Sequence, residues 1–288
     1  MASSGLPPSS PPGEPEPWSE KDFGCVVGFL GNHIGISLEA HRMGLLQARL
    51  RSRLQGRGLE SFTQFFEQAL RPDPSGWGAQ LLIDLSTVNH TSFFREPAHF
   101  TFLIEKVSGW LREQPGAPVR VWSAGCSSGQ EPYSMVMALA EALPPHAMSR
   151  LDVWGSDLSL EMLKVAAGAI YTARDVQGVS QARLRRFFLL GRGPREGSFR
   201  IVPEIRDLVK FRHIDLRTGH WPVPADFHIV FCRNVSIYFS EDDRQVLLGR
   251  LAQHIRPGGW LVMGNGEILP AVPPRFRKHS PSIFQKED

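Results

Sequence analysis

Two patterns of hydrophobic residues divide the chain. From about residue 20 to residue 85, apolar residues recur at helical spacing, and Leu46, Leu50 and Leu54 give one of these helices an apolar side. A segment rich in proline and glycine, residues 71–78, then interrupts the pattern. Beyond it, short apolar runs alternate with helical stretches. The first region predicts a small helical domain, and the second predicts an α/β domain.

The second region has the order of elements that is typical of a doubly wound sheet. Candidate strands cover residues 119–123, 151–156, 227–231 and 260–263, and candidate helices cover 132–143, 160–169 and 242–254. Such sheets are mainly parallel and bind ligands at the carboxyl ends of their strands. A glycine-rich turn between two apolar runs, within about residues 186–213, predicts an antiparallel β-hairpin inserted into this domain.

The same patterns predict the domain organisation. We expect a disordered tail rich in proline and serine over residues 1–18, a helical domain over 19–80 and an α/β domain over 81–288. No apolar run approaches the roughly 20 residues of a membrane span, and the N-terminus lacks the apolar core of a signal peptide. Three widely spaced cysteines argue against a disulfide framework. We therefore expect a cytoplasmic protein.

A loop of small residues follows the first candidate strand. It reads Gly125-Cys-Ser-Ser-Gly129, so its backbone can approach a ligand closely, but Ser127 stands where a dinucleotide fingerprint has its middle glycine. Asp157 ends the second candidate strand, where a carboxylate can cap a helix or accept hydrogen bonds from both hydroxyls of a ribose. S-adenosylmethionine has a ribose but no pyrophosphate. These features together favour it over a nicotinamide dinucleotide.

Four segments match one protein family. They are residues 89–96 (Asn-His-Thr-Ser-Phe-Phe-Arg-Glu), residues 122–134, residues 155–157 with 169–171, and residues 231–239 (Phe-Cys-Arg-Asn-Val-Ser-Ile-Tyr-Phe). From about Gly35 onward the chain resembles the chemotaxis receptor methyltransferases of the CheR type, which esterify glutamates of bacterial chemoreceptors with S-adenosylmethionine and release S-adenosylhomocysteine. The resemblance implies a class I methyltransferase fold, a Rossmann-like doubly wound α/β sheet, with a small antiparallel β insert and an all-helical N-terminal domain.

The resemblance also implies which residues form the site. Carried over position by position, it assigns cofactor contacts to Asn89, Thr91, Arg95, Gly125, Glu131, Asp157, Asp215, Leu216, Cys232, Arg233 and Asn234. Arg95 and Tyr238 are the expected catalytic residues. The family often has asparagine where Asp215 stands. Simpler interpretations stay open, because Arg95 could merely pair with Glu96 and Tyr238 could be a core residue.

These residue types suit methyl transfer to a carboxylate. A glutamate side chain has an ordinary pKa of about 4.3, so it is already an anionic nucleophile at neutral pH and needs no general base. Arg95 can orient that carboxylate through a two-pronged contact, with the Tyr238 hydroxyl as a second donor. Water could be excluded by Phe93, Phe94, Phe231 and Phe239. We expect no metal ion, because His90 and His99 lack ligand partners at a suitable spacing.

Two surfaces are candidates for recognition of a receptor. Arg42, Arg49 and Arg53 fall within about 40° of one another at 100° per residue of helix. We interpret them either as a solvated basic face or, as the resemblance implies, as the face that docks on an acidic helical receptor bundle. The insert around residues 191–197 is similar to that of family members that capture a receptor tail as an added strand. The basic face lacks interleaved aromatic residues, so we expect no nucleic acid partner.

Two alternative functions stay open. A methyltransferase of the same fold could act on a small molecule or on RNA, and the segments around Arg95 and Tyr238 argue against this alternative. The protein could also be a non-catalytic scaffold that binds S-adenosylmethionine in a signalling array. Every expected cofactor position is filled, which argues against a degenerate site. On the leading hypothesis, we expect recruitment of the protein to membrane receptor arrays.

Overall fold

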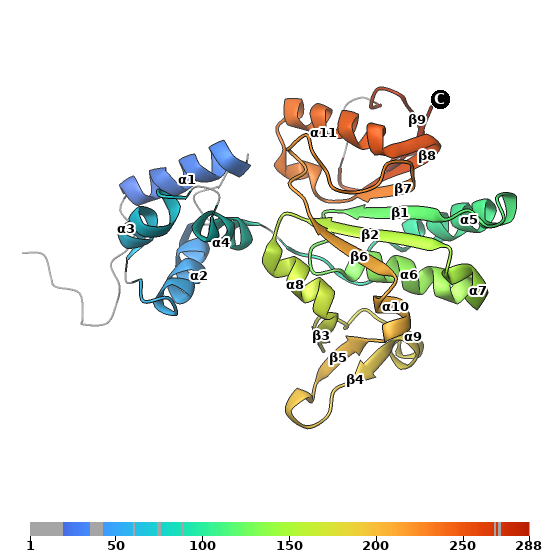
Figure 1. The fold of residues 1–288 in the computed structure, drawn as a ribbon, viewed down its shortest axis with the longest axis horizontal. Coiled ribbons are helices and arrows are strands. Elements are labelled where there is room, and N and C mark those ends of the chain that lie inside the picture. Colours follow the sequence, from blue (N-terminus) through green and yellow to red (C-terminus); the bar gives the residue numbers. More distant parts are fainter. Residues whose placement is uncertain are drawn as a thin grey trace, which may run out of the picture. The chain divides into compact units, whose positions relative to one another are not determined.

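The computed structural model describes residues 20–34, 43–59, 61–73, 76–87, 89–267, 269 and 272–287. The predicted tail, residues 1–18, lies outside them. The chain divides into two compact units, Met1–Ser86 and Thr87–Asp288. In Figure 1 the first unit carries helices α1 to α4, and the second carries both sheets. No helix in the described ranges is both long enough and apolar enough to cross a membrane.

The described elements of the first unit are all helices. They are α1 (Glu20–Ile34), α2 (Met43–Gln55), α3 (Phe62–Phe65), which continues as a π-helical turn (Phe66–Leu70), and α4 (Trp77–Ser86). Leu46, Leu50 and Leu54 are buried, so the apolar side of α2 faces the core of this unit. Ser61 caps α3, because its hydroxyl accepts a hydrogen bond from the amide of Gln64 at 3.2 Å.

The second unit is built on a seven-stranded sheet of order β6-β2-β1-β7-β8-β10-β9. Its strands are β1 (Val119–Ala124), β2 (Leu151–Asp157), β6 (Val209–His213), β7 (Phe227–Cys232), β8 (Ile255–Met263), β9 (Phe276–Ser280) and β10 (Ile283–Lys286). The five strands from β6 to β8 are parallel, and β10 is antiparallel to both of its neighbours. The carboxyl ends of β1, β2, β6 and β7 therefore meet at one edge of the sheet.

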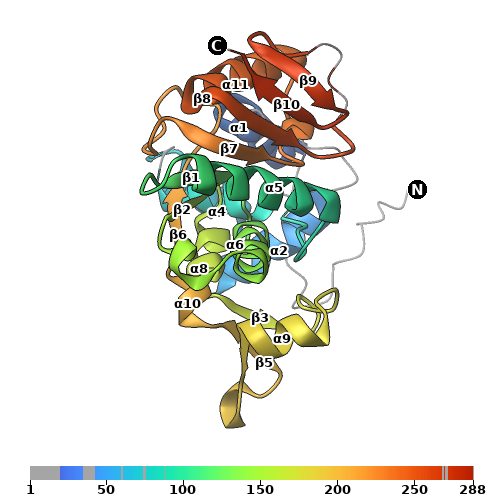
Figure 2. The same ribbon diagram turned by 90° about the vertical axis from the view of Figure 1, so that its right-hand side faces the viewer.

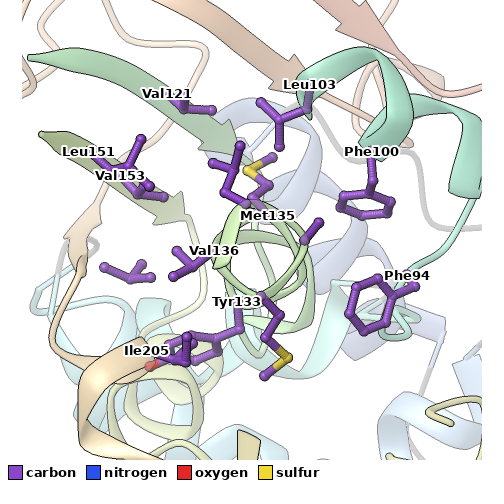
Figure 3. Packing of buried hydrophobic residues seen from close by; sticks show 14 of the residues in the cluster. Phe94, Phe100, Leu103, Val121, Tyr133, Met135, Val136, Leu151, Val153 and Ile205 are labelled. Atoms are coloured by element: carbon purple, nitrogen blue, oxygen red, sulfur yellow. The ribbon is translucent and has the colours of Figure 1, made fainter. Parts of the chain in front are cut away.

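Helices cover both faces of this sheet. Helices α5 (Pro97–Glu113) and α6 (Gln130–Ala142) pack on one face, and α11 (Glu241–His254) packs on the other. Successive residues of β1 point to opposite faces, so that Val121 packs with α5 and α6 while Trp122 packs with α11. Figure 3 shows the first of these cores, with Leu103 of α5 and Met135 of α6 near Val121. The predicted doubly wound sheet is confirmed.

A three-stranded antiparallel sheet is inserted into the second unit (Figure 2). It consists of β3 (Ile170–Thr172), β5 (Ser198–Ile201) and β4 (Phe188–Leu190), in that order across the sheet, and α9 (Gln181–Phe187) leads into β4. The insert is thus confirmed, but its bounds differ from the predicted 186–213. Strand β3 lies before that range, and β6, which lies within it, pairs with β2 in the large sheet.

The other described α-helices of the second unit are α7 (Pro145–Met148), α8 (Leu160–Gly168) and α10 (Pro203–Arg206), and two short 3-10 helices cover Gly193–Arg195 and Ser236–Tyr238. The insert is tied to the loop after β1, because the Tyr171 hydroxyl donates a hydrogen bond to the carbonyl of Ser128 at 2.8 Å. Phe93 packs edge-on against the rings of Tyr171 and Phe188, with centroid distances of 4.9 and 5.4 Å. The segment before α5 is therefore fixed against both the insert and the edge of the large sheet.

Candidate active site

The loop between β1 and α6 needs glycine at two positions. Gly125 and Gly129 have φ angles of +84° and +90°, where other residues are strained. A Cβ on Gly125 would also lie 2.3 Å from Cγ2 of Val235, so the chain after β7 packs directly on this loop. The amide of Gly125 donates a hydrogen bond to the carbonyl of Ser156 at 2.8 Å. The loop is therefore held between the carboxyl ends of β2 and β7.

Asp157 ends β2, and its carboxylate fixes two loops. Oδ2 accepts a hydrogen bond from the amide of Ser127 at 2.7 Å, and Oδ1 accepts one from the amide of Ser159 at 2.9 Å, where α8 begins. The amide of Ile214 donates to the carbonyl of Asp157 at 3.0 Å. The chain after β6 therefore runs beside Asp157.

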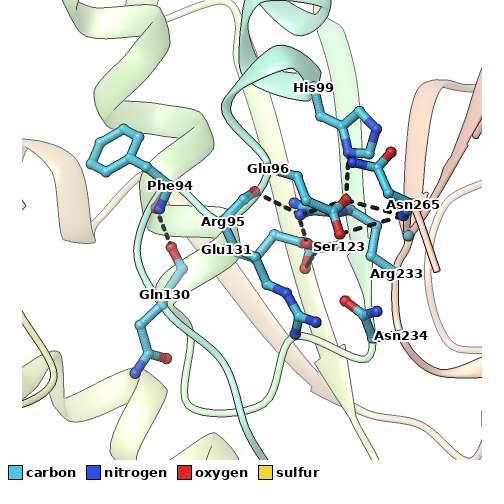
Figure 4. A network of polar contacts seen from close by, with 12 residues as sticks. Phe94, Arg95, Glu96, His99, Ser123, Gln130, Glu131, Arg233, Asn234 and Asn265 are labelled. Atoms are coloured by element: carbon cyan, nitrogen blue, oxygen red, sulfur yellow. Dashed lines mark hydrogen bonds and ion pairs between the residues drawn. The ribbon is translucent and has the colours of Figure 1, made fainter. Parts of the chain in front are cut away.

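A buried guanidinium, that of Arg233, joins three segments at this edge (Figure 4). Only 2% of the Arg233 side chain is exposed. Its Nη1 lies 3.1 Å from Oε2 of Glu131, and its Nη2 lies 3.1 Å from Oε2 of Glu96. Nη2 also donates a hydrogen bond to the carbonyl of Arg95 at 2.6 Å. Arg233 thus links the chain after β7 to the start of α6 and to the segment before α5.

The two carboxylates are held from a second side as well. The Ser123 hydroxyl donates to Oε1 of Glu131 at 2.7 Å, and the amide of Asn265 lies 3.3 Å from both oxygens of Glu96. Removing one partner of a buried ion pair leaves an uncompensated charge, which costs about 3–5 kcal/mol. Arg233 has two such partners. Loss of its guanidinium would therefore leave both carboxylates without their cation and remove one contact of the segment that carries Arg95.

Several residues at this edge have a left-handed backbone although they are not glycine. Phe94 and Glu96, on either side of Arg95, have φ angles of +54° and +58°, and Ser127 and Asn234 have +50° and +59°. Each such conformation costs on the order of 1–3 kcal/mol and persists only where the surroundings enforce it. Here Arg233 and Asp157 supply such contacts. Strain of this kind clusters at functional sites, which supports this edge as the candidate site.

Burial also sets the protonation of several groups. It raises the pKa of the Glu131 carboxyl, and the neighbouring Arg233 opposes that rise. It raises the pKa of the Cys126 and Cys232 thiols well above the usual value. Because the thiolate is the reactive form of cysteine, neither thiol is a nucleophile at neutral pH. The site thus offers charged guanidinium and carboxylate groups and no activated sulfur.

His99 is a neutral member of the network. Burial, with the nearby Arg233 charge, lowers its pKa to about 4. Its Nε2 lies 2.9 Å from the Ser282 hydroxyl, and its Nδ1 lies 3.2 Å from Oε2 of Glu96. The Ser282 hydroxyl donates in turn to the side-chain carbonyl of Asn265 at 3.0 Å. These contacts tie α5 to the segments after β8 and before β10.

The structure brings together Arg95, Glu131 and Arg233 among the predicted site residues. Glu96 pairs with Arg233, not with Arg95, which differs from the simpler interpretation of Arg95. The half-buried Arg95 side chain instead donates from Nη1 to the carbonyl of His90 at 3.4 Å. Its guanidinium is therefore held only weakly by the chain itself.

Other predicted residues line the same edge. The carbonyl of Asn89 accepts a hydrogen bond from the Ser127 hydroxyl at 3.2 Å, so the segment before α5 contacts the loop between β1 and α6. Thr91 lies half-buried between Asn89 and Arg95. Cys232 is fully buried at the end of β7.

Three predicted residues differ from these in their described contacts. Asp215 follows β6, but its Oδ1 accepts a hydrogen bond from Nε of Arg217 at 3.0 Å, so its carboxylate is engaged within its own loop. Leu216 is buried and packs in the core beside α11. Tyr238 ends the short 3-10 helix Ser236–Tyr238, and its side chain lies outside the described part of the chain.

The sequence interpretation assigned no place in the site to two residues of the network, Glu96 and His99. Glu96 stands next to Arg95 in the motif, and this adjacency was the only signal for it. His99 gave no signal because its partners come from distant segments. Within the described residues, no cluster of three or more histidines, cysteines or acids could hold a metal ion.

Residues 89–284 match the model of the CheR methyltransferase S-adenosylmethionine-binding domain, and residues 21–79 match the model of the CheR methyltransferase all-alpha domain. The chain belongs to the CheR methyltransferase family. It is 33% identical over 268 residues to a chemotaxis protein methyltransferase of Klebsiella aerogenes, covering 93% of this chain and 90% of the relative. It is 35% identical over 254 residues to chemotaxis protein methyltransferase 2 of Pseudomonas aeruginosa, covering 87% of each.

Membership of the CheR methyltransferase family confirms the predicted cofactor, S-adenosylmethionine, and the class I methyltransferase fold. The geometry fits this cofactor. Asp157 places a carboxylate beside the loop of small residues after β1, where it accepts a hydrogen bond from the amide of Ser127. These features suit a nucleoside with a ribose to be held, as the family's cofactor has.

His99 predicts a pH dependence of stability. An unfolded histidine has a pKa of about 6.5, whereas folding lowers the pKa of His99 to about 4. Between these values the unfolded chain binds the extra proton, so this contribution is complete above pH 6.5 and is lost as the pH falls toward 4. We expect His99→Gln to reduce the slope of unfolding free energy against pH in that window, as measured by urea titration followed by tryptophan fluorescence.

His220→Gln is the matched control, because His220 is exposed and packs in neither core. It should keep the wild-type slope. Parallel curves for His99→Gln and the wild type between pH 4 and 6.5 would contradict a neutral, buried His99.

Proposed function

We propose that this protein transfers the methyl group of S-adenosylmethionine to glutamate side chains of bacterial chemoreceptors, forming methyl esters. The observation that carries the proposal is the position of Arg95. Its backbone is fixed by Arg233 at the edge where the loops after β1 and β2 meet, while its side chain has only one long hydrogen bond within the described part of the chain. That guanidinium is available to a substrate carboxylate. The names of the relatives, chemotaxis protein methyltransferases, support the same pathway.

The proposed cofactor contacts follow the edge described above. Asp157 holds the ribose. Asn89 and Thr91 contact the cofactor from the segment before α5, and Asp215 with Leu216 lies beside the adenine. Glu131, Cys232, Arg233 and Asn234 close the site. S-adenosylmethionine, when bound, supplies an electrophilic methyl group on a sulfonium. Both Nη groups of Arg233 are engaged, by Glu131, Glu96 and a carbonyl, so in this proposal it holds the walls of the site rather than moving during turnover.

In the reaction, the protein itself positions the substrate carboxylate and excludes water. A substrate glutamate is ionised at neutral pH, so no base has to remove a proton. Arg95 orients the carboxylate by a two-pronged contact, and the Tyr238 hydroxyl is the proposed second donor. Phe94 and Phe231 are buried against Phe100, with centroid distances of 5.6 and 6.4 Å, and so form a dry wall behind this segment.

The proposed receptor-docking face lies on α2. Arg49 and Arg53 are exposed, and Arg42, the third member of the predicted face, lies outside the described residues. The first turn of α2 carries no acid. An acidic helical bundle would complement the proposed face, which would recruit the protein to receptor arrays at the membrane.

A second proposed contact is the capture of a receptor tail by the insert. Strand β4 is the last strand of the three-stranded sheet, so one of its edges pairs with no other strand of the described chain. Leu189 and Leu190 on this strand are 52% and 65% exposed. An extended peptide could add to such an edge through its backbone, with an apolar side chain resting on the leucines.

The proposed function is tested by transfer of a labelled methyl group to receptor-containing membranes. We expect the label to enter the receptor and to be released as methanol by mild base, because methyl esters hydrolyse under these conditions. A base-stable label, or label on RNA or a small molecule, would overturn the proposal. Arg95→Ala should lower turnover by about 100-fold, the loss expected when a reacting group is no longer aligned. Arg112→Ala, at an exposed arginine on α5, is the matched control and should match the wild type.

The docking face predicts a selective effect on receptor affinity. The double variant Arg49→Glu/Arg53→Glu should raise KM for receptor membranes about tenfold, because reversed charges repel an acidic bundle. It should leave the affinity for S-adenosylhomocysteine unchanged. Added salt should raise KM of the wild type but not of the variant. The double variant Arg112→Glu/Lys278→Glu, at two exposed residues of the second unit, is the charge-matched control, and an equal rise in KM for both double variants would refute the proposed face.

A further inference from the structure

Glu267 lies in the loop after β8, and only 5% of it is exposed. Its carboxylate accepts four hydrogen bonds. Oε2 takes the amides of Asn234 and Gly264, both at 2.7 Å. Oε1 takes the amide of Ser236 at 2.9 Å and the Ser236 hydroxyl at 2.8 Å. Three of these donors belong to the chain after β7, so Glu267 joins two loops at the carboxyl edge of the sheet.

The loop that Glu267 holds is the one that follows Arg233. Asn234 has a left-handed backbone, with φ of +59°, and the 3-10 helix Ser236–Tyr238 begins two residues later. The contact is close, because a Cβ on Gly264 would lie 2.8 Å from both Nδ2 of Asn234 and Oε2 of Glu267. The strained turn is therefore enforced from one side by Glu267 and from the other by the ion pairs of Arg233.

We propose that Glu267 is a positioning residue for the methyl transfer. It touches neither cofactor nor substrate, and it acts by fixing the backbone that leads to Tyr238. The inference rests on the proposed function and adds a residue to it. The chemistry requires a carboxylate, since three backbone amides and a hydroxyl converge on two oxygens that only accept. A glutamine of the same size would turn its NH2 group toward at least one of these amides.

The test compares Glu267→Gln, Glu267→Asp and Ser236→Ala. We expect the glutamine variant to lower kcat about 10- to 100-fold, as small misplacements of reacting groups do, while KM and the affinity for S-adenosylhomocysteine stay within about threefold. The aspartate variant keeps the four acceptor directions and should recover part of kcat. Ser236→Ala removes only the hydroxyl donor and leaves all three amide contacts, so it should match the wild type.

Hydrogen exchange supplies a readout that does not need turnover. Amides of residues 234–238 should exchange faster in Glu267→Gln than in the wild type, and as slowly as the wild type in Ser236→Ala. Unchanged exchange together with unchanged kcat would overturn the proposal, and so would an equal loss of kcat and cofactor affinity. Should wild-type protein transfer no base-labile label, the proposed function fails. The exchange data would still decide whether Glu267 holds the loop.

Discussion

The candidate site depends on one buried cation. The guanidinium of Arg233 is shared by Glu131 at the start of α6, by Glu96 before α5 and by the carbonyl of Arg95. Each of these segments leaves the core at the carboxyl edge of the sheet, where backbone without regular pairing has to be held by side chains. Because the cation is 2% exposed, both ion pairs are nearly free of solvent screening. The loops at this edge are therefore arranged around one buried cation, the Arg233 guanidinium.

Strain and burial at this edge have a common origin. The left-handed residues Phe94, Glu96 and Asn234 lie next to atoms that Arg233 or Glu267 hold. A methyl transfer to an anionic side chain needs no proton movement, so alignment and exclusion of water are what the fold must supply. Rigid loops around a buried ion network provide the alignment, and the aromatic core behind them excludes water. Arg95, held by its backbone and loosely tied at its side chain, combines a fixed position with an available charge.

Sequence patterns predicted the sheet but not all of its strands. The runs that became β1, β2 and β7 are mostly apolar and almost entirely buried, since both of their faces are covered. Strand β9 reads Phe-Arg-Lys-His-Ser and buries only its first residue, so hydrophobicity could not reveal it. The motifs of the site could be recognised in the sequence, but the contacts between them could not. Arg233 binds the carbonyl of a residue 138 positions away, and no local period encodes such a contact.

In the proposed function, Arg233 and Asp157 together build the cofactor edge. A crystal structure of the protein with S-adenosylhomocysteine is the decisive test. We expect the ribose hydroxyls within hydrogen-bond distance of the Asp157 carboxylate, with Arg233 still paired to both Glu96 and Glu131. A ribose bound away from Asp157, or an Arg233 side chain released from both carboxylates to contact the ligand, would contradict it.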